Sequence, residues 1–231
     1  MGSMEPTPHG SSGEAVAEAR RRWPWPLDAL SFVVIVAGSM LGAIVGAVLV
    51  LAWAALSGTP WRDLGFVRPR RWPLTVLTGV VAGVVFKLAM KSVVMPLLGA
   101  PPVNQAYRDL TGNAAALPSM VLAVVIGAGF GEEVLFRGYL FERFGRWFGR
   151  SIGSSIAAVI VTTALFAAAH YSGQGRPGVE QALVTGLVFA SVYARTRALP
   201  FVMIVHAAFD LAAVWLIYNG WETTVAHWFF K

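Results

Sequence analysis

Long apolar runs, separated by short basic connections, dominate the pattern along this chain. A run of about 20 apolar residues is long enough to cross the hydrocarbon core of a bilayer as a helix. The pattern therefore predicts an all-α, polytopic transmembrane helical bundle with about six or more membrane helices. The runs lie at residues 27–57, 73–98, 118–138, 152–171, 179–195 and 199–219, and the third continues into an amphipathic stretch that ends at Arg150.

The first run is longer than one span needs, which favours a tilted or overlong helix or one that begins with an interfacial turn. Gly38, Gly42 and Gly46 recur at every fourth position in it. On one helix this spacing places all three on a single face, where a neighbouring helix can approach closely. Gly79 and Gly83 predict a similar packing face on the second run.

Two lysines lie toward the end of the second run, Lys87 and Lys91. A long side chain near a helix end can bury its methylene groups while its ammonium group reaches the membrane surface. We therefore expect both lysines to extend toward the interface or to cap this helix.

Composition supports the membrane class. The chain has 231 residues, of which 56% are apolar and 13% charged, whereas soluble domains carry roughly 25% charged residues. The formal charge of +6 comes from 18 basic residues that lie mostly between the apolar runs. Such residues meet lipid headgroups and set topology, so no nucleic-acid partner is expected. The absence of cysteine excludes disulfides, thiolate metal sites and a cysteine nucleophile.

The apolar pattern divides the chain into four parts. We expect a disordered polar and basic tail, of which residues 1–3 look like a cloning remnant, then membrane helices and loops, a membrane core and an interfacial aromatic tail. Their boundaries are 1–22, 23–117, 118–219 and 220–231.

Basic residues in short loops predict the topology, because such loops favour the cytoplasmic side. Loop 58–72, the turn at 142–150 and the pair Arg195 and Arg197 are the basic connections. Arg20, Arg21 and Arg22 conflict with this pattern if residues 27–57 cross the bilayer once. Either the first segment does not simply span the membrane, or the rule fails at this end.

Two adjacent carboxylates interrupt the third run. A charge at this depth costs roughly 2.5–3.5 kcal/mol, so Glu132 and Glu133 call for partners or for a hydrated cavity. Glu133 and Arg137 are four residues apart, in the orientation that favours an ion pair on one helix face. Glu132 is rotated by about 100° and has no such partner. A free, buried carboxylate beside water can act as a general base.

Two histidines occupy other runs. His170 and Glu132 are both 19 positions from Ser151, the natural turn between the third and fourth helices, so an antiparallel hairpin places them at equal depth. His206 and Asp210 are four apart on the last run, where Asp210 can accept the imidazole N–H and fix its tautomer. Three helices can then bring an acid and two imidazoles to one cavity.

Three short motifs carry a family resemblance: EEVLFRG at 132–138, FAAAH at 166–170 and HAAFD at 206–210. Their order, spacing and apolar setting resemble the CPBP (CAAX protease and bacteriocin-processing, or Abi) intramembrane proteases, which include the type II CAAX prenyl endopeptidases. The resemblance covers about residues 118–212. It implies that Glu132 is the general base, that His170 helps to hold the water, and that Glu133 and Arg137 support the base.

The same resemblance implies that His206 stabilises the oxyanion with help from residue 210. Members of the family commonly have Asn there, whereas this chain has Asp210. An amide can donate a hydrogen bond to an oxyanion, but an ionised carboxylate repels one. Asp210 is therefore expected to orient His206, to be protonated, or to ligate a metal.

No cofactor is favoured, and zinc is the alternative. Glu132, His170 and His206 would be its ligands, since three protein ligands suffice for a catalytic zinc. The chain lacks the His-Glu-x-x-His spacing that places two ligands on one helical turn. We therefore favour metal-independent water activation by glutamate.

These features predict an intramembrane endopeptidase, with a membrane-embedded or lipidated peptide or a C-terminal CAAX-like tail as its substrate. The Ala-, Val- and Arg-rich composition suggests a bacterial inner membrane protein, and we expect its active site to open toward the cytoplasm. The alternatives are the zinc-dependent protease, a proton- or ion-coupled carrier, and a non-catalytic membrane scaffold. The sequence identifies neither the substrate nor the oligomeric state.

Overall fold

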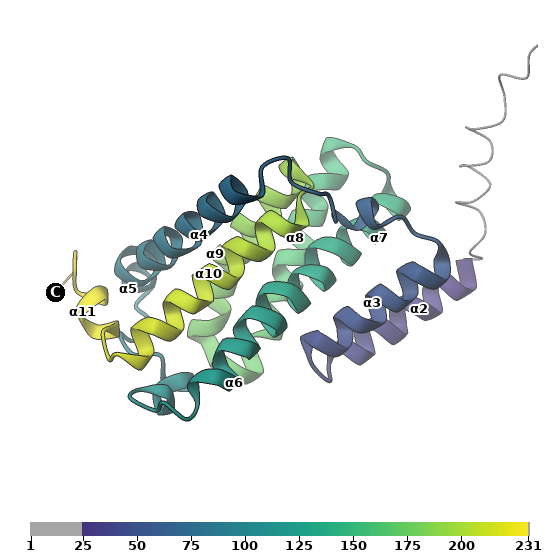
Figure 1. The fold of residues 1–231 in the computed structure, drawn as a ribbon. Helices are drawn as coiled ribbons and strands as arrows, with labels where there is room; N and C mark the ends of the chain where they lie inside the picture. Colours follow the sequence, from purple (N-terminus) through teal and green to yellow (C-terminus); the bar gives the residue numbers. More distant parts are fainter. Residues whose placement is uncertain (1–24, 231) are drawn as a thin grey trace, which may run out of the picture.

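The computed structural model describes residues 25–230, and within that range the protein is helical and contains no strand (Figure 1). Four of its helices are long and apolar enough to cross a membrane, and they coincide with the second, third, fourth and sixth predicted runs. Their bounds are Trp72–Leu97, Leu117–Phe148, Ile152–Ala169 and Leu199–Tyr218. The predicted helical membrane bundle is confirmed. Large apolar side chains on its outer surface, such as Ile152 and Leu56, are exposed in a way that suits lipid.

The first apolar run is a helical hairpin, so the prediction of one helix over residues 27–57 is wrong. Helix α2 (Trp25–Ser39) and helix α3 (Ala43–Ser57) have 15 residues each. Gly42 lies in the turn between them with a φ of 134°, which favours glycine. A Cβ on Gly38 would meet the end of the Leu49 side chain, so α3 lies against α2 at this glycine.

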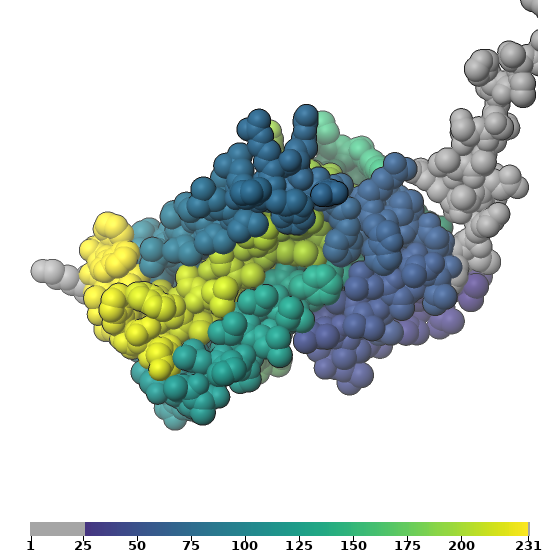
Figure 2. Space-filling view, in the orientation of Figure 1, coloured from purple at the N-terminus to yellow at the C-terminus, as the bar shows by residue number. Residues whose placement is uncertain are grey.

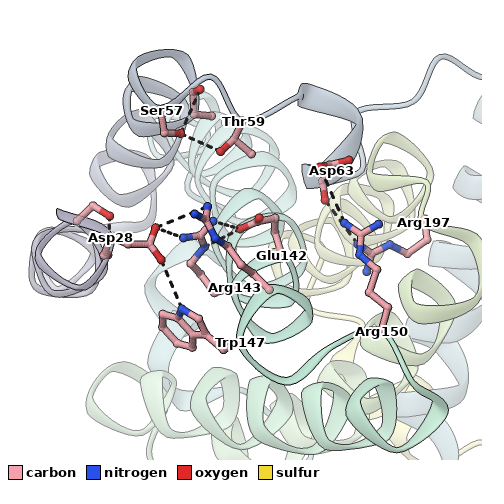
Figure 3. A network of polar contacts seen from close by, with 12 residues as sticks. Asp28, Ser57, Thr59, Asp63, Glu142, Arg143, Trp147, Arg150 and Arg197 are labelled. Carbon is pink, nitrogen blue, oxygen red and sulfur yellow. Dashed lines mark hydrogen bonds and ion pairs between the residues drawn. The ribbon is translucent and has the colours of Figure 1, made fainter. Parts of the chain in front are cut away.

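Arg143 links this hairpin to the rest of the bundle through ion pairs (Figure 3). It lies on α7 (Leu140–Phe148), is 1% exposed, and pairs with Asp28 at the start of α2 and with Glu142. Its guanidinium also lies 4.3 Å from the centre of the Trp53 ring. The chain therefore enters α2 and leaves α3 at the end of the bundle that carries α7.

The basic connections meet at this same end of the bundle. Arg150 lies 3.9 Å from the Asp63 carboxylate, and Arg197 donates a hydrogen bond of 3.5 Å to the Asp63 carbonyl (Figure 3). Asp63 belongs to a short helix, η1 (Trp61–Leu64). Because α2 begins and α3 ends here, residues 27–57 do not form the single span on which the predicted conflict with the positive-inside rule depended. The arginines at 20–22 lie outside the described residues, as does the predicted tail at 1–22.

The third run forms one continuous helical rod with two π-helical stretches. Helix α6 (Leu117–Leu122) continues into η4 (Ala123–Glu132), η5 (Val134–Tyr139) and α7. π-helical turns are wider than α-helical turns and are frequent at functional sites. Both carboxylates lie at the junction of η4 and η5.

Helix α10 (Leu199–Tyr218) runs between this rod and α4 (Trp72–Ala89), as Figure 2 shows on one face of the molecule. A Cβ on Gly83 would lie 2.3 Å from the Val205 carbonyl oxygen, and one on Gly79 would lie 2.8 Å from the Ile204 side chain. The predicted glycine packing face on this run is therefore confirmed. Beyond Ala89, the helix continues through η2 (Met90–Val94) into α5 (Met95–Leu97).

Ser151 is the N-cap of helix α8 (Ile152–Ala169), and its hydroxyl accepts a hydrogen bond of 3.1 Å from the Ser154 N–H. It leads to α9 (Tyr171–Thr196), which is kinked at Gly175, where φ is 61° and ψ is −158°. The fifth predicted run, 179–195, forms the second part of α9. This helix is not among the four that are long and apolar enough to cross a membrane.

Two short helices lie at the other end of the bundle, away from the basic connections. They are η3 (Gln105–Leu110) and α11 (Glu222–Ala226). The Glu222 carboxylate accepts a hydrogen bond of 3.1 Å from the Asn104 N–H. The Gly112 N–H donates a hydrogen bond of 2.9 Å to the Tyr218 carbonyl. The loop that precedes α6 is thereby held against the end of α10.

Candidate active site

One interior cavity of about 340 Å³ receives the polar side chains of three helical segments. Glu132 projects from the end of η4, His170 lies at the end of α8, and His206 and Asp210 come from α10. The structure thus brings the acid and the two imidazoles together at one site. Glu133 and Arg137 are not among the residues that line the cavity.

The buried partner of His206 is Glu133. The Nδ1 atom of His206 lies 2.7 Å from Oε1 of Glu133, and Arg137 Nη1 lies 2.8 Å from that same oxygen. The side chains of Glu133, Arg137 and His206 are 0%, 1% and 5% exposed, respectively. The predicted Glu133–Arg137 ion pair is confirmed, and it forms part of a three-residue chain that holds the imidazole.

Arg137 has further contacts that fix its position. Its Nη2 atom donates a hydrogen bond of 3.3 Å to the Gly186 carbonyl on α9, and its guanidinium lies 4.5 Å from the centre of the Phe166 ring. A buried guanidinium in this setting depends on its carboxylate partner, because an uncompensated buried charge is costly.

Asp210 is the more distant neighbour of His206. Its Oδ2 atom lies 3.5 Å from Nε2 of His206, beyond the usual range of a strong hydrogen bond. Glu133 is the closer acceptor and binds the opposite ring nitrogen, whereas the expected role of Asp210 in orienting His206 from Nε2 stays a prediction. No local spacing signals this contact, since Glu133 and His206 are 73 residues apart.

Glu132 presents the free carboxylate. Its side chain is 21% exposed, and its Oε2 atom lies 3.9 Å from Nε2 of His206. This oxygen has no hydrogen-bond partner among the residues that the structure describes. Adjacent carboxylates therefore differ sharply in their surroundings: Glu133 is enclosed and paired, whereas Glu132 faces the cavity.

His170 has a defined orientation. Its Nδ1 atom lies 2.8 Å from the Phe166 carbonyl oxygen, one turn earlier on α8. Because a carbonyl can only accept a hydrogen bond, Nδ1 must carry the proton. In the neutral ring, Nε2 is then an acceptor that can bind a water hydrogen.

Tyr107 is a cavity residue that the sequence did not indicate. It lies on η3, and its hydroxyl accepts a hydrogen bond of 3.2 Å from the Gln174 side-chain amide. Burial raises the pKa of the Tyr107 hydroxyl, and the nearby charges of Asp210 and Glu132 raise that pKa further. The hydroxyl is therefore neutral at physiological pH and can donate a hydrogen bond into the cavity.

The cavity lies toward the end of the bundle that carries η3. Asn104, Tyr107 and Gln174 line it at this end, and the basic connections lie at the opposite end. The expected opening of this cavity toward the cytoplasm stays a prediction, which a labelling experiment on the two ends of the bundle can test.

The donor set fits a metal ion poorly. Among residues 25–230, no group of three or more His, Asp or Glu side chains has an arrangement that could hold a metal. We therefore derive no catalytic step through zinc.

The fold and the cavity define a helical membrane protein with an acid–imidazole site in its interior. Residues 114–212 match the family model described as "Type II CAAX prenyl endopeptidase Rce1-like". This segment contains all six residues singled out in the sequence, and the family resemblance is confirmed over it. The match supports a CAAX-type intramembrane protease. No match was found among curated proteins or among solved structures.

Proposed function

We propose that this protein is an intramembrane endopeptidase in which Glu132 activates water to hydrolyse a peptide bond of a membrane-associated substrate. The observation that carries the proposal is the free Glu132 carboxylate, which shares a 340 Å³ cavity with two oriented imidazoles from separate helices. A general base requires an unpaired carboxylate within reach of water. The family match at residues 114–212 supports the same reaction class.

The first step is proton transfer from water to the Glu132 carboxylate as the water oxygen attacks the scissile carbonyl carbon. Nε2 of His170 accepts the other water hydrogen and so orients the nucleophile, which follows from the proton on Nδ1. Holding a reactant in this way removes much of the entropic cost of the attack.

The tetrahedral intermediate carries its negative charge on the former carbonyl oxygen. Nε2 of His206 can donate a hydrogen bond to that oxygen when the imidazole is doubly protonated. Glu133 stabilises this form from Nδ1 at 2.7 Å, and Asp210 and Glu132 lie within 4 Å of Nε2. Preorganised donors of this kind are commonly worth about 2.7–4 kcal/mol in the transition state.

Collapse of the intermediate breaks the C–N bond. Protonated Glu132 returns its proton to the leaving amine, which restores the carboxylate and releases two peptide products. Glu133 and Arg137 act as positioning residues, because they touch His206 and not the reacting atoms.

A purified-protein assay tests this proposal. We expect wild-type protein in lipid nanodiscs to cleave a quenched fluorescent peptide that carries a farnesylated cysteine followed by three residues. The Glu132→Gln variant should retain its thermal unfolding temperature and lose cleavage by at least about a hundredfold, as loss of a general base predicts. Cleavage by Glu132→Gln at the wild-type rate would overturn the assignment.

Metal dependence has its own test. Under the glutamate mechanism, cleavage should survive prolonged treatment with a zinc chelator and should not increase when zinc is added back. Loss of activity on chelation with recovery on addition of zinc would instead establish the metalloprotease alternative.

A further inference from the structure

Lys87 is a buried cation beside the catalytic cavity. The expectation that Lys87 and Lys91 reach the membrane surface is wrong, because they are 6% and 8% exposed. Lys91 is neutralised by Glu222, whose carboxylate lies 2.6 Å from its ammonium group. Lys87 instead donates a hydrogen bond of 3.0 Å to the Gln181 side-chain carbonyl.

The Lys87 ammonium group therefore has unused donors. An ammonium group has three N–H bonds, and the structure accounts for the one directed at Gln181. The Phe209 ring lies 4.8 Å away and offers only its π face. Within the described residues, no carboxylate lies within 4 Å of this ammonium group. The charges of Asp210 and Glu222 act on this ammonium group only from beyond that distance, so its free N–H donors can still take a carboxylate at hydrogen-bond distance.

The lysine lies close to the chemistry. Gly83, one turn earlier on α4, packs directly on the α10 backbone at Val205 and Phe209, which is the level of His206. Four residues of α-helix advance about 6 Å. Lys87 therefore lies about one turn beyond the catalytic level, toward the end of the bundle at which the cavity is lined by η3.

A second cavity of about 310 Å³ adjoins the first at this lysine. Lys87, Gln181, Gln174 and Asn104 line both cavities, whereas Glu132 and His206 line only the first. The Lys91–Glu222 ion pair lines only the second cavity. A peptide that reaches from Glu132 past Lys87 thus enters a small compartment lined by an ion pair.

We propose that Lys87 and Gln181 form a carboxylate-binding subsite that receives the free C-terminus of the peptide substrate. The inference rests on the proposed function and assigns two residues, Lys87 and Gln181, to hold the C-terminal end of its substrate. A compartment of this size is at the lower end of the range for small-ligand sites. It therefore suits a chain terminus better than a continuing polypeptide.

The test measures binding separately from hydrolysis. The farnesylated peptide is labelled with a fluorophore and prepared with a C-terminal carboxylate or a carboxamide, and its anisotropy is titrated with Glu132→Gln protein in phosphatidylcholine nanodiscs. We expect the carboxylate form to bind about tenfold or more tightly than the carboxamide, as for a hydrogen bond to a charged group. In the Lys87→Met, Glu132→Gln protein, both forms should bind equally weakly.

Matched variants keep the inference falsifiable if Lys87→Met fails to fold. Lys87→Arg retains the positive charge and should retain the preference for the carboxylate. Gln181→Glu supplies Lys87 with an internal carboxylate of similar size and should abolish the preference. An undiminished preference in Gln181→Glu, or equal binding of both peptides to protein that contains Lys87, would overturn the subsite.

Other anions are distinguished by two further arms. A carboxamide peptide with Asp at its last position tests a side-chain carboxylate, and restored tight binding would overturn the assignment to the C-terminus. Replacing phosphatidylcholine with phosphatidylglycerol tests occupation by a lipid headgroup. A preference that disappears in phosphatidylglycerol would identify the lipid as the ligand and overturn the peptide assignment.

Hydrolysis by the active protein separates this inference from the proposed function. Cleavage of both peptides with equal kcat/KM would overturn the subsite and leave the protease intact. A Lys87-dependent binding preference without any cleavage by protein that contains Glu132 would support the subsite and contradict the proposed reaction.

Discussion

Oε1 of Glu133 accepts hydrogen bonds from both Arg137 and His206, at 2.8 and 2.7 Å. One buried oxygen thus links the η5 helix to α10 and fixes the imidazole that faces the cavity. The neighbouring carboxylate, Glu132, takes no part in this link and lines the cavity instead. Two adjacent glutamates therefore have separable roles, one in structure and one in chemistry.

Glu133→Gln should destabilise the protein, because it leaves the buried Arg137 guanidinium without its counter-charge. Breaking a buried ion pair typically costs about 3–5 kcal/mol. We expect a clear fall in the thermal unfolding temperature measured in detergent. Glu132→Gln is the matched control and should unfold close to the wild-type temperature, since its Oε2 atom makes no hydrogen bond and lies 3.9 Å from His206. Equal unfolding temperatures for the two variants would contradict this division of roles.

Asp210→Asn should retain activity. The Asp210 carboxylate lies 3.5 Å from Nε2 of His206, and an asparagine amide at the same position can still hydrogen bond there. An amide can also donate to the oxyanion, so kcat is expected to stay within about tenfold of wild type or to rise. Asp210→Ala removes the group and should lower kcat by about tenfold or more. Steady-state kinetics with the quenched peptide compare the two. A greater loss in Asp210→Asn than in Asp210→Ala would show that the negative charge is required.

Tyr107→Phe removes a hydrogen-bond donor from the cavity and should therefore lower kcat/KM by about tenfold. It should leave the alkaline side of the pH profile unchanged. The Tyr107 pKa is raised above its ordinary value of about 10 by burial and by the charges of Asp210 and Glu132. The hydroxyl therefore stays protonated between pH 7 and 9, and its ionisation cannot cause a loss of activity in that range. Its contribution to folding stability is present below the unfolded pKa and declines as the pH rises above it. An alkaline limb that moves in Tyr107→Phe would refute this account.

The membrane orientation can be mapped with single cysteines, because the natural chain has none. Ala114 lies in the exposed loop before α6, and Arg70 is exposed in the basic connection. If the basic end is cytoplasmic, a membrane-impermeant maleimide should label Ala114→Cys in intact spheroplasts. It should label Arg70→Cys only after lysis. The reverse pattern would place the cavity toward the cytoplasm and would break the positive-inside rule.

Local spacing predicted the parts of the site that lie within one helix or across one helix turn. The Glu133–Arg137 pair follows from a four-residue separation, and the common cavity of Glu132 and His170 follows from a turn at Ser151 between two neighbouring helices. The Glu133–His206 contact and the Lys87–Gln181 contact join residues 73 and 94 positions apart. Such contacts depend on how helices pack against one another, and one sequence carries no periodic signal for them.

The hairpin was missed for a different reason. Residues 27–57 are continuously apolar after Asp28, and hydrophobicity alone does not distinguish one long helix from two short ones. Gly42 lies in the turn that separates the two helices, and its φ of 134° is a backbone conformation that favours glycine. In the sequence, its regular spacing with Gly38 and Gly46 instead suggested a helix face.

The hairpin also affects the lipid around the protein. Two helices of 15 residues reach about 22 Å, which is about 8 Å less than the hydrocarbon thickness of a typical bilayer. The hairpin tip lies beside the carboxylate, since a Cβ on Gly131 would lie 3.0 Å from the Ala43 backbone. Acyl chains next to the tip must shorten or bend to cover this mismatch. We expect the membrane to be thinner near Glu132, which would shorten the path of water and of a polar peptide segment to the reacting carboxylate.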